Sequence, residues 1–177
     1  MKIITSVLIA FFAILSVSCN MYESAVPIAG PEKSTLDTTL TGFWRVYETS
    51  DTTPVDNFLM IIPFNEKEYL ITTFSVVDSM MKDMMQLRVY NSFVGKQELF
   101  NVTVLEPEPQ KTSWIFFRLD KITTDSIKVD YLDEDFADTT FATSKKLCKY
   151  MKNNADSMMR SFVRYGIIKK ENKVEFK

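Results

Sequence analysis

The residue types that most often carry out chemistry are scarce in this chain of 177 residues, which has no histidine, two cysteines and four glycines. Without histidine the chain lacks the commonest general base and the commonest transition-metal ligand. Serine–histidine and cysteine–histidine nucleophile systems are therefore excluded. Four scattered glycines cannot form a phosphate-binding loop. We expect no catalytic residue, no cofactor and no enzymatic activity.

Acidic residues gather where the last of the predicted strands ends: Asp130, Asp133, Glu134, Asp135 and Asp138. Such oxygen ligands could hold calcium, but the spacing lacks the regular ligand order and the turn glycine of a calcium loop. We interpret the cluster as a solvated acidic turn and expect no metal site. Two carboxylates at a defined separation could also hydrolyse a glycoside, yet no signature selects a pair among the 23 acidic residues.

Methionines form a second conspicuous group, at Met80, Met81, Met84, Met85, Met158 and Met159. Thioethers favour Cu(I), but no histidine or thiolate stands near them in the sequence. Methionine also fills irregular cores and adaptable apolar surfaces. We expect a core or a mobile lid, with the flexible wall of an apolar ligand pocket as the alternative.

The first residues have the layout of an export signal that is removed from the mature protein. A positive start at Lys2 is followed by an apolar run from Ile3 to Val17, which is shorter than the roughly 20 residues of a spanning helix. Small residues at Ser16 and Ser18 precede Cys19, so residues 1–18 resemble a bacterial lipoprotein signal. In such signals the cysteine becomes the acylated first residue, carrying chains such as palmitate.

The lipoprotein resemblance implies a membrane attachment at Cys19, with the outer membrane as the default location and the leaflet undetermined. Ser16 departs from the usual pattern, and an ordinary signal peptidase could also cut after Ser18. With Cys19 acylated, Cys148 has no partner in the chain, and we expect it to be a buried, inert thiol. The nearly balanced charge, with a net value of −2, and the scattered basic residues argue against nucleic-acid binding.

The predicted strands and helices of the chain begin after an extended N-terminal tether. Pro27, Gly30 and Pro31 indicate such a tether over residues 19–38, and residues 39–177 then form a single domain. From residue 40 apolar residues recur with period two, in seven candidate strands at about 43–48, 57–64, 68–74, 84–94, 98–105, 112–119 and 126–132. Closely spaced strands with short polar connections predict an antiparallel sandwich or barrel.

Residues 144–164 change to a helical period. Leu147, Met151, Met158 and Phe162 share one face, which we expect to pack on the β domain. Thr143 or Ser144 could be the N-cap, and Asn153-Asn154 could divide the segment into two helices. Gly166 would end it, and residues 174–176 could return as a short edge strand.

Gly42-Phe43-Trp44 at the start of the first predicted strand resembles the opening of lipocalin-like and calycin domains. Residues 62–69, 99–102 and 114–118 are similar to uncharacterised lipocalin-like lipoproteins, mostly of the Bacteroidota. The resemblance implies a meander barrel of seven or eight strands with a C-terminal helical segment. It also implies that Trp44 plugs the closed end, with Arg118 or Arg164 over its indole.

Two functions fit this barrel. In the first, the interior binds a small apolar or amphipathic ligand. In the second, the barrel is solid and docks another envelope protein. An eight-stranded barrel is just wide enough either to be filled by its side chains or to hold one small ligand. An enclosed cavity of at least roughly 300 Å³ would favour the ligand, and a filled interior with an exposed apolar patch would favour the partner.

Overall fold

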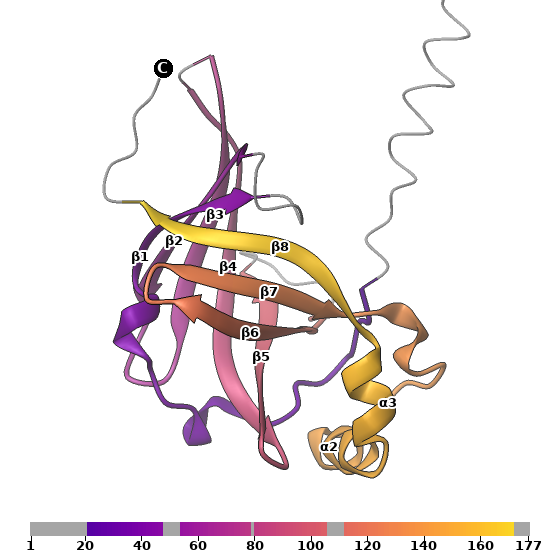
Figure 1. Cartoon of the computed structure of the whole chain (residues 1–177). Helices are drawn as coiled ribbons and strands as arrows, with labels where there is room; N and C mark the ends of the chain where they lie inside the picture. Colours follow the sequence, from indigo (N-terminus) through magenta and orange to yellow (C-terminus); the bar gives the residue numbers. More distant parts are fainter. Residues whose placement is uncertain (1–20, 48–53, 79, 106–111, 172–177) are drawn as a thin grey trace, which may run out of the picture.

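The computed structural model describes residues 21–47, 54–78, 80–105 and 112–171. They form a closed barrel of eight antiparallel strands in meander order (Figure 1). The strands are β1 (Gly42–Tyr47), β2 (Pro54–Pro63), β3 (Tyr69–Val77), β4 (Met80–Val94), β5 (Gln97–Val104), β6 (Ile115–Thr123), β7 (Ser126–Leu132) and β8 (Phe162–Glu171). The predicted β-barrel class is confirmed.

Closure of the barrel depends on β1, which pairs with β2 on one side and β8 on the other. Trp44 lies opposite Leu59 of β2 and Lys170 of β8. Since side chains alternate along a strand, Trp44 and Val46 belong to the buried interior cluster. Every strand of a closed barrel has a partner on both sides, which removes the unpaired edges of an open sheet.

The helical segment is shorter than predicted. It consists of α2 (Ser144–Asn153) and α3 (Ala155–Arg160), and Asn154 stands between the two helices. Thr143 is the N-cap, because its side chain accepts a hydrogen bond from the amide of Lys146. The prediction of a helix to residue 164 is wrong, because the chain turns at Ser161 and continues as β8.

The N-terminal segment is not the flexible tether that the sequence predicts. Met21 forms a β-bridge with Asp133, and the amide of Tyr22 donates to the carbonyl of Leu132. Ile28, which is 1% exposed, donates its amide to Asn101 Oδ1. The segment then passes through two short 3₁₀ helices, η1 (Pro31–Lys33) and η2 (Thr38–Leu40). It is extended over much of its length, but its Tyr22 and Ile28 side chains are buried in a cluster with residues of the barrel.

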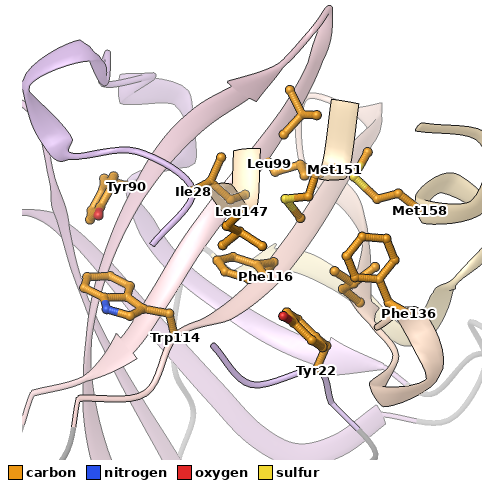
Figure 2. Close-up of a cluster of buried hydrophobic side chains, with 12 residues drawn as sticks. Tyr22, Ile28, Tyr90, Leu99, Trp114, Phe116, Phe136, Leu147, Met151 and Met158 are labelled. Atoms are coloured by element: carbon orange, nitrogen blue, oxygen red, sulfur yellow. The ribbon is translucent and has the colours of Figure 1, made fainter. Parts of the chain in front are cut away.

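Two apolar clusters hold this arrangement together. The inner cluster fills part of the barrel around Trp44. The outer cluster, drawn in Figure 2, joins the N-terminal segment and the helices to the outside of the barrel. Its side chains include Tyr22, Ile28, Tyr90, Leu99, Trp114, Phe116, Phe136, Leu147, Met151 and Met158. The predicted packing of the helix face on the β domain is confirmed, and Lys145, Lys146, Lys149 and Lys152 are exposed.

The ends of β3 and β4 extend beyond the barrel as a two-stranded hairpin (Figure 1). Val76 pairs with Met81 and Val77 with Met80. The strand β5 ends at Val104, and the amide of Leu105 donates a hydrogen bond to the carbonyl of Gln86. The hairpin presents exposed apolar side chains at Val77, Met80, Met81, Met84 and Met85.

Several predictions fall on residues that the structure does not describe. The signal peptide at residues 1–18, the lipidation site Cys19 and the edge strand at 174–176 lie outside the described ranges. Among the residues that are described, no helix is both long and apolar enough to span a membrane.

Candidate functional site

The barrel interior contains an apolar cavity of about 150 Å³. All strands of the barrel except β1 supply its wall, and η2 supplies Leu40. The lining residues are Leu40, Leu59, Ile61, Tyr69, Ile71, Thr73, Leu87, Val89, Phe100, Val102, Phe117, Leu119, Ile127, Val129, Tyr165 and Ile168. No carboxylate, amine or thiol occurs in this lining, so the cavity suits apolar groups.

One end of the cavity is closed by the segment that leads into β1. Leu40 is 5% exposed and lines the cavity, and its carbonyl oxygen accepts the indole N–H of Trp44 at 2.8 Å. Asp37 holds the same segment on the barrel, because its amide donates to Tyr69 Oη at 2.5 Å. Burial raises the pKa of that phenol. We call this the closed end of the barrel.

Exposure of the lining residues increases toward the opposite end. Along β3, Tyr69 is 2% exposed, whereas Ile71 and Thr73 are half-buried. Along β4 the same change runs from Val89, which is 3% exposed, to half-buried Leu87. The cavity therefore opens at the end where the β3–β4 hairpin projects, and we call this the open end.

The size of the cavity limits what it can hold. Ligand pockets are usually about 300–1,000 Å³, so this cavity is about half of the smallest usual volume. An apolar cavity of about 150 Å³ can nevertheless take up benzene. The interior is therefore neither filled nor large enough for a whole drug-sized molecule. Its volume corresponds to a group of about six carbon atoms, the size of benzene.

Trp44 is fully buried in the interior cluster. Gly42 begins the strand with a φ of +126°, a conformation that favours glycine. The expectation that Arg118 or Arg164 covers the indole is wrong. Lys170 does so, with Nζ 5.4 Å from the ring.

Arg118 and Arg164 instead converge on Asp130 on the outside of the barrel. Asp130 is 2% exposed, and it accepts hydrogen bonds from Arg118 Nη2 and, at 2.6 Å, from Arg164 Nε. Burial alone would raise the pKa of this carboxyl, but the two guanidinium groups outweigh it and hold the pKa below its usual range. The arrangement is a structural ion-pair network.

The other acidic residues of the cluster do not join Asp130 in a site. Asp133 caps η3 (Glu134–Phe136) by accepting from the Asp135 amide. In the described ranges no three groups among histidine, cysteine, aspartate and glutamate are placed to hold a metal ion.

The methionines separate into two groups. Met158 is buried in the outer cluster, where Met159 packs against it. Met80, Met81, Met84 and Met85 are 46–62% exposed on the hairpin, so they are not part of a core. Cys148 is half-buried beside the outer cluster, and within the described ranges it has no disulfide partner.

The cavity itself could not be located from the sequence. Its wall consists of the ordinary inward-facing residues of seven strands, which no motif sets apart. The sequence does show period-two alternation of apolar residues. This alternation identifies the side chains that point into the barrel, but not the volume that remains between them.

Comparison of the chain with family models, with curated proteins and with solved structures gives no match. The class that the fold and the cavity define is therefore an eight-stranded antiparallel barrel with a small apolar interior.

Proposed function

We propose that this protein is a non-catalytic binding module whose barrel takes up a small apolar group in its interior cavity. The cavity carries this proposal, because it is apolar on all sides and opens at one end. Burial of apolar surface contributes about 25 cal/mol for each Å², so an alkyl or aromatic group gains free energy by entering. The small volume favours either a small hydrocarbon or the apolar end of an amphipathic molecule.

A titration of the mature protein with 1-octanol tests the proposal, using isothermal calorimetry. The matched variants are Leu87→Trp, which fills the cavity from β4, and Leu70→Trp, which places the same side chain on the opposite face of the neighbouring strand. We expect saturable binding to the wild type and to Leu70→Trp, and at least tenfold weaker binding to Leu87→Trp. Denaturant melts establish that both variants are folded. Absence of saturable binding to the wild type would contradict the proposal.

The alternative, a solid barrel that docks another envelope protein, requires a filled interior. The interior cavity counts against that requirement, but its volume of about 150 Å³ is below the roughly 300 Å³ that would favour the ligand, and the exposed hairpin agrees with the alternative. Native mass spectrometry of the purified mature protein separates the two. A co-purified small molecule supports the binding module, and a stoichiometric protein partner supports docking.

We also propose that Cys19 attaches the protein to a membrane of the cell envelope through its acyl chains. The sequence layout supports this, and the structure adds a geometric consequence. Met21 is bridged to Asp133, and only Asn20 lies between it and Cys19, so Cys19 is at most about 7 Å from a fixed point on the barrel. An anchored barrel would lie against the membrane surface.

Fractionation of cells that express Cys19→Ser tests the anchor. One acyl chain gives marginal attachment, whereas several hold firmly. We expect the wild type in the membrane fraction and the variant in the soluble envelope fraction. A wild type that is itself fully soluble would overturn the anchor and leave the ligand proposal untouched.

A further inference from the structure

The hairpin that projects from the barrel leaves one edge of β4 uncovered (Figure 1). Strand β5 pairs with β4 only from Leu87 onward, and the amide of Leu105 donates to the carbonyl of Gln86. Among the residues that the structure describes, no strand pairs with the same edge between Met80 and Met85. An unpaired edge offers its backbone N–H and C=O groups to a strand of another chain.

The side chains along this free edge are mostly apolar. Met80, Met81, Met84 and Met85 are 46–62% exposed. Leu105, which stands where the free edge ends, is 40% exposed as well. Exposed apolar strand edges associate with other chains, and methionine adapts its shape to the surface that it meets. The free edge of β4 therefore has the composition of an interface.

Two opposite charges lie at the centre of the free edge. Lys82 and Asp83 are exposed, and in the described part of the chain neither forms an ion pair. The strand also carries a β-bulge here, and Asp83 has a φ of +53°. Charges and bulges on an edge hinder its pairing with unrelated strands. A partner that fits must therefore present the opposite charges at the same two positions.

A second copy of the same strand presents them, because residues 80–85 read Met-Met-Lys-Asp-Met-Met. When two copies lie antiparallel about a two-fold axis between Lys82 and Asp83, Lys82 of each copy stands opposite Asp83 of the other. The methionines on either side, such as Met81 and Met84, then face each other. A two-fold interface must be complementary to itself, and opposite charges that face each other stabilise a pair of strands.

We propose that the protein forms a symmetric dimer through the free edge of β4, with Lys82 of each copy against Asp83 of the other. A shift of the register by one residue would place Lys82 opposite Lys82, or Asp83 opposite Asp83, and like charges in these positions destabilise the pair. A shift by two residues would leave both charges opposite methionine. The two charges therefore select one register, and they do so against the alternatives.

The length of the free edge agrees with this register. Met80 pairs with Met85 of the second copy, so the paired strands end just before Gln86, whose carbonyl already accepts from Leu105. Six residues span only about 20 Å, and interfaces at the small end of the range belong to transient complexes. We therefore expect a weak dimer that depends on protein concentration. The dimer does not require a ligand in the cavity.

Disulfide trapping tests the dimer and reads its register. Met81→Cys and Met84→Cys are made separately in the mature chain, in which Cys19→Ser and Cys148→Ser remove the native thiols. Directly opposite residues of antiparallel strands have Cα atoms about 4.5–5.5 Å apart, which a disulfide can bridge. In the proposed register position 81 is opposite position 84 of the second copy, but about 10 Å along the strand from position 81 of that copy.

Under mild oxidation, the mixture of the two variants should form covalent dimers at least fivefold faster than either variant alone. The mixture of Met81→Cys with Ile122→Cys is the control, because Ile122 is 55% exposed and lies at the closed end of the barrel. Adding Lys82→Gln to both copies should slow trapping by about two- to tenfold, the effect of losing two exposed ion pairs. Concentrated salt should act in the same direction.

Sedimentation equilibrium gives a second readout that needs no added cysteine. We expect a monomer–dimer equilibrium for the mature chain with Cys19→Ser, and a shift toward monomer in Lys82→Asp, which sets carboxylates against each other. Equal trapping rates for the mixture and the single variants would overturn the inference, as would a strictly monomeric protein at up to about 1 mM. A monomer whose hairpin binds phosphatidylcholine vesicles would also overturn it and assign the apolar edge to lipid.

Discussion

Trp44 donates its indole N–H to the carbonyl oxygen of Leu40, four residues earlier in the chain, across 2.8 Å. The bond joins β1, the first strand of the barrel, to η2, which covers the closed end of the cavity. Because Leu40 also lines the cavity, the closed end of the cavity depends on the position of Trp44.

Replacing Trp44 by alanine should lower the free energy of unfolding by about 3–5 kcal/mol, because the change leaves a large hole in a packed core. Trp44→Phe retains much of the ring and removes the donor to Leu40, so its cost should be smaller, at about 1–3 kcal/mol. Urea denaturation measures both values. A loss below about 1 kcal/mol for Trp44→Ala would mean that the side chain does not support the barrel.

Asp130→Asn should destabilise the protein by about 3–5 kcal/mol, because it leaves the guanidinium of Arg118, whose side chain is 15% exposed, without its closest anion. Asp120 is the matched control. Its carboxylate lies 3.5 Å from Arg118 Nε, but its side chain is 49% exposed, so Asp120→Asn should cost less than about 1 kcal/mol. Similar losses for the two variants in denaturant melts would show that burial does not distinguish them.

Ile28→Ala should cost about 2–4 kcal/mol if residues 21–38 are part of the folded domain. Lys33→Ala, at an exposed position of the same segment, should change stability by less than about 0.5 kcal/mol. Hydrogen exchange provides an independent readout, with slow exchange expected for the amide of Ile28, which donates to Asn101. Rapid exchange and no cost for Ile28→Ala would restore the tether that the sequence predicts.

Asp37→Asn should be less stable than the wild type at neutral pH, and the difference should disappear in acid. The hydrogen bond from Lys121 is the main cause that lowers the pKa of Asp37 from 3.8 to about 2. Because the pKa of Asp37 is lower in the folded protein than in the unfolded chain, its ionised carboxylate stabilises the fold. This contribution is fully present above pH 3.8 and is lost as pH falls through about 2. The contribution at neutral pH should be below about 1 kcal/mol, because the pair is largely exposed. Urea melts at pH 6 and at about pH 2 measure it, and a difference that persists in acid would exclude the ion pair as its source.

Seven of the eight strands could be predicted from period-two alternation, but β8 could not. Met158 and Phe162 continue a helical spacing, so the pattern extends the helix past its true end at Arg160. Gly166 was expected to stop a helix, whereas it lies inside β8. A Cβ atom at Gly166 would be 2.6 Å from the carbonyl oxygen of Tyr47, so glycine permits the close approach of β8 to β1.

The N-terminal segment and the cavity were not predictable for a different reason. Tyr22 and Ile28 follow no regular period, and their burial depends on the surface that β4 to β7 present to them. The cavity is a small difference between the space inside the barrel and the volume of its side chains, and no single residue encodes it. The N-cap at Thr143, by contrast, was one of two candidates predicted from the sequence. Capping can be predicted because it depends on only a few neighbouring residues.

The central claim is that the barrel interior takes up an apolar group, and anomalous diffraction tests it most directly. Crystals of the mature protein are soaked with an octanol that is brominated at its terminal carbon. We predict a bromine peak inside the barrel, between the side chains of Leu59, Phe117 and Ile127, which should be lost in Leu87→Trp. Bromine found only on the outer surface or along the hairpin, with an empty interior, would contradict the account.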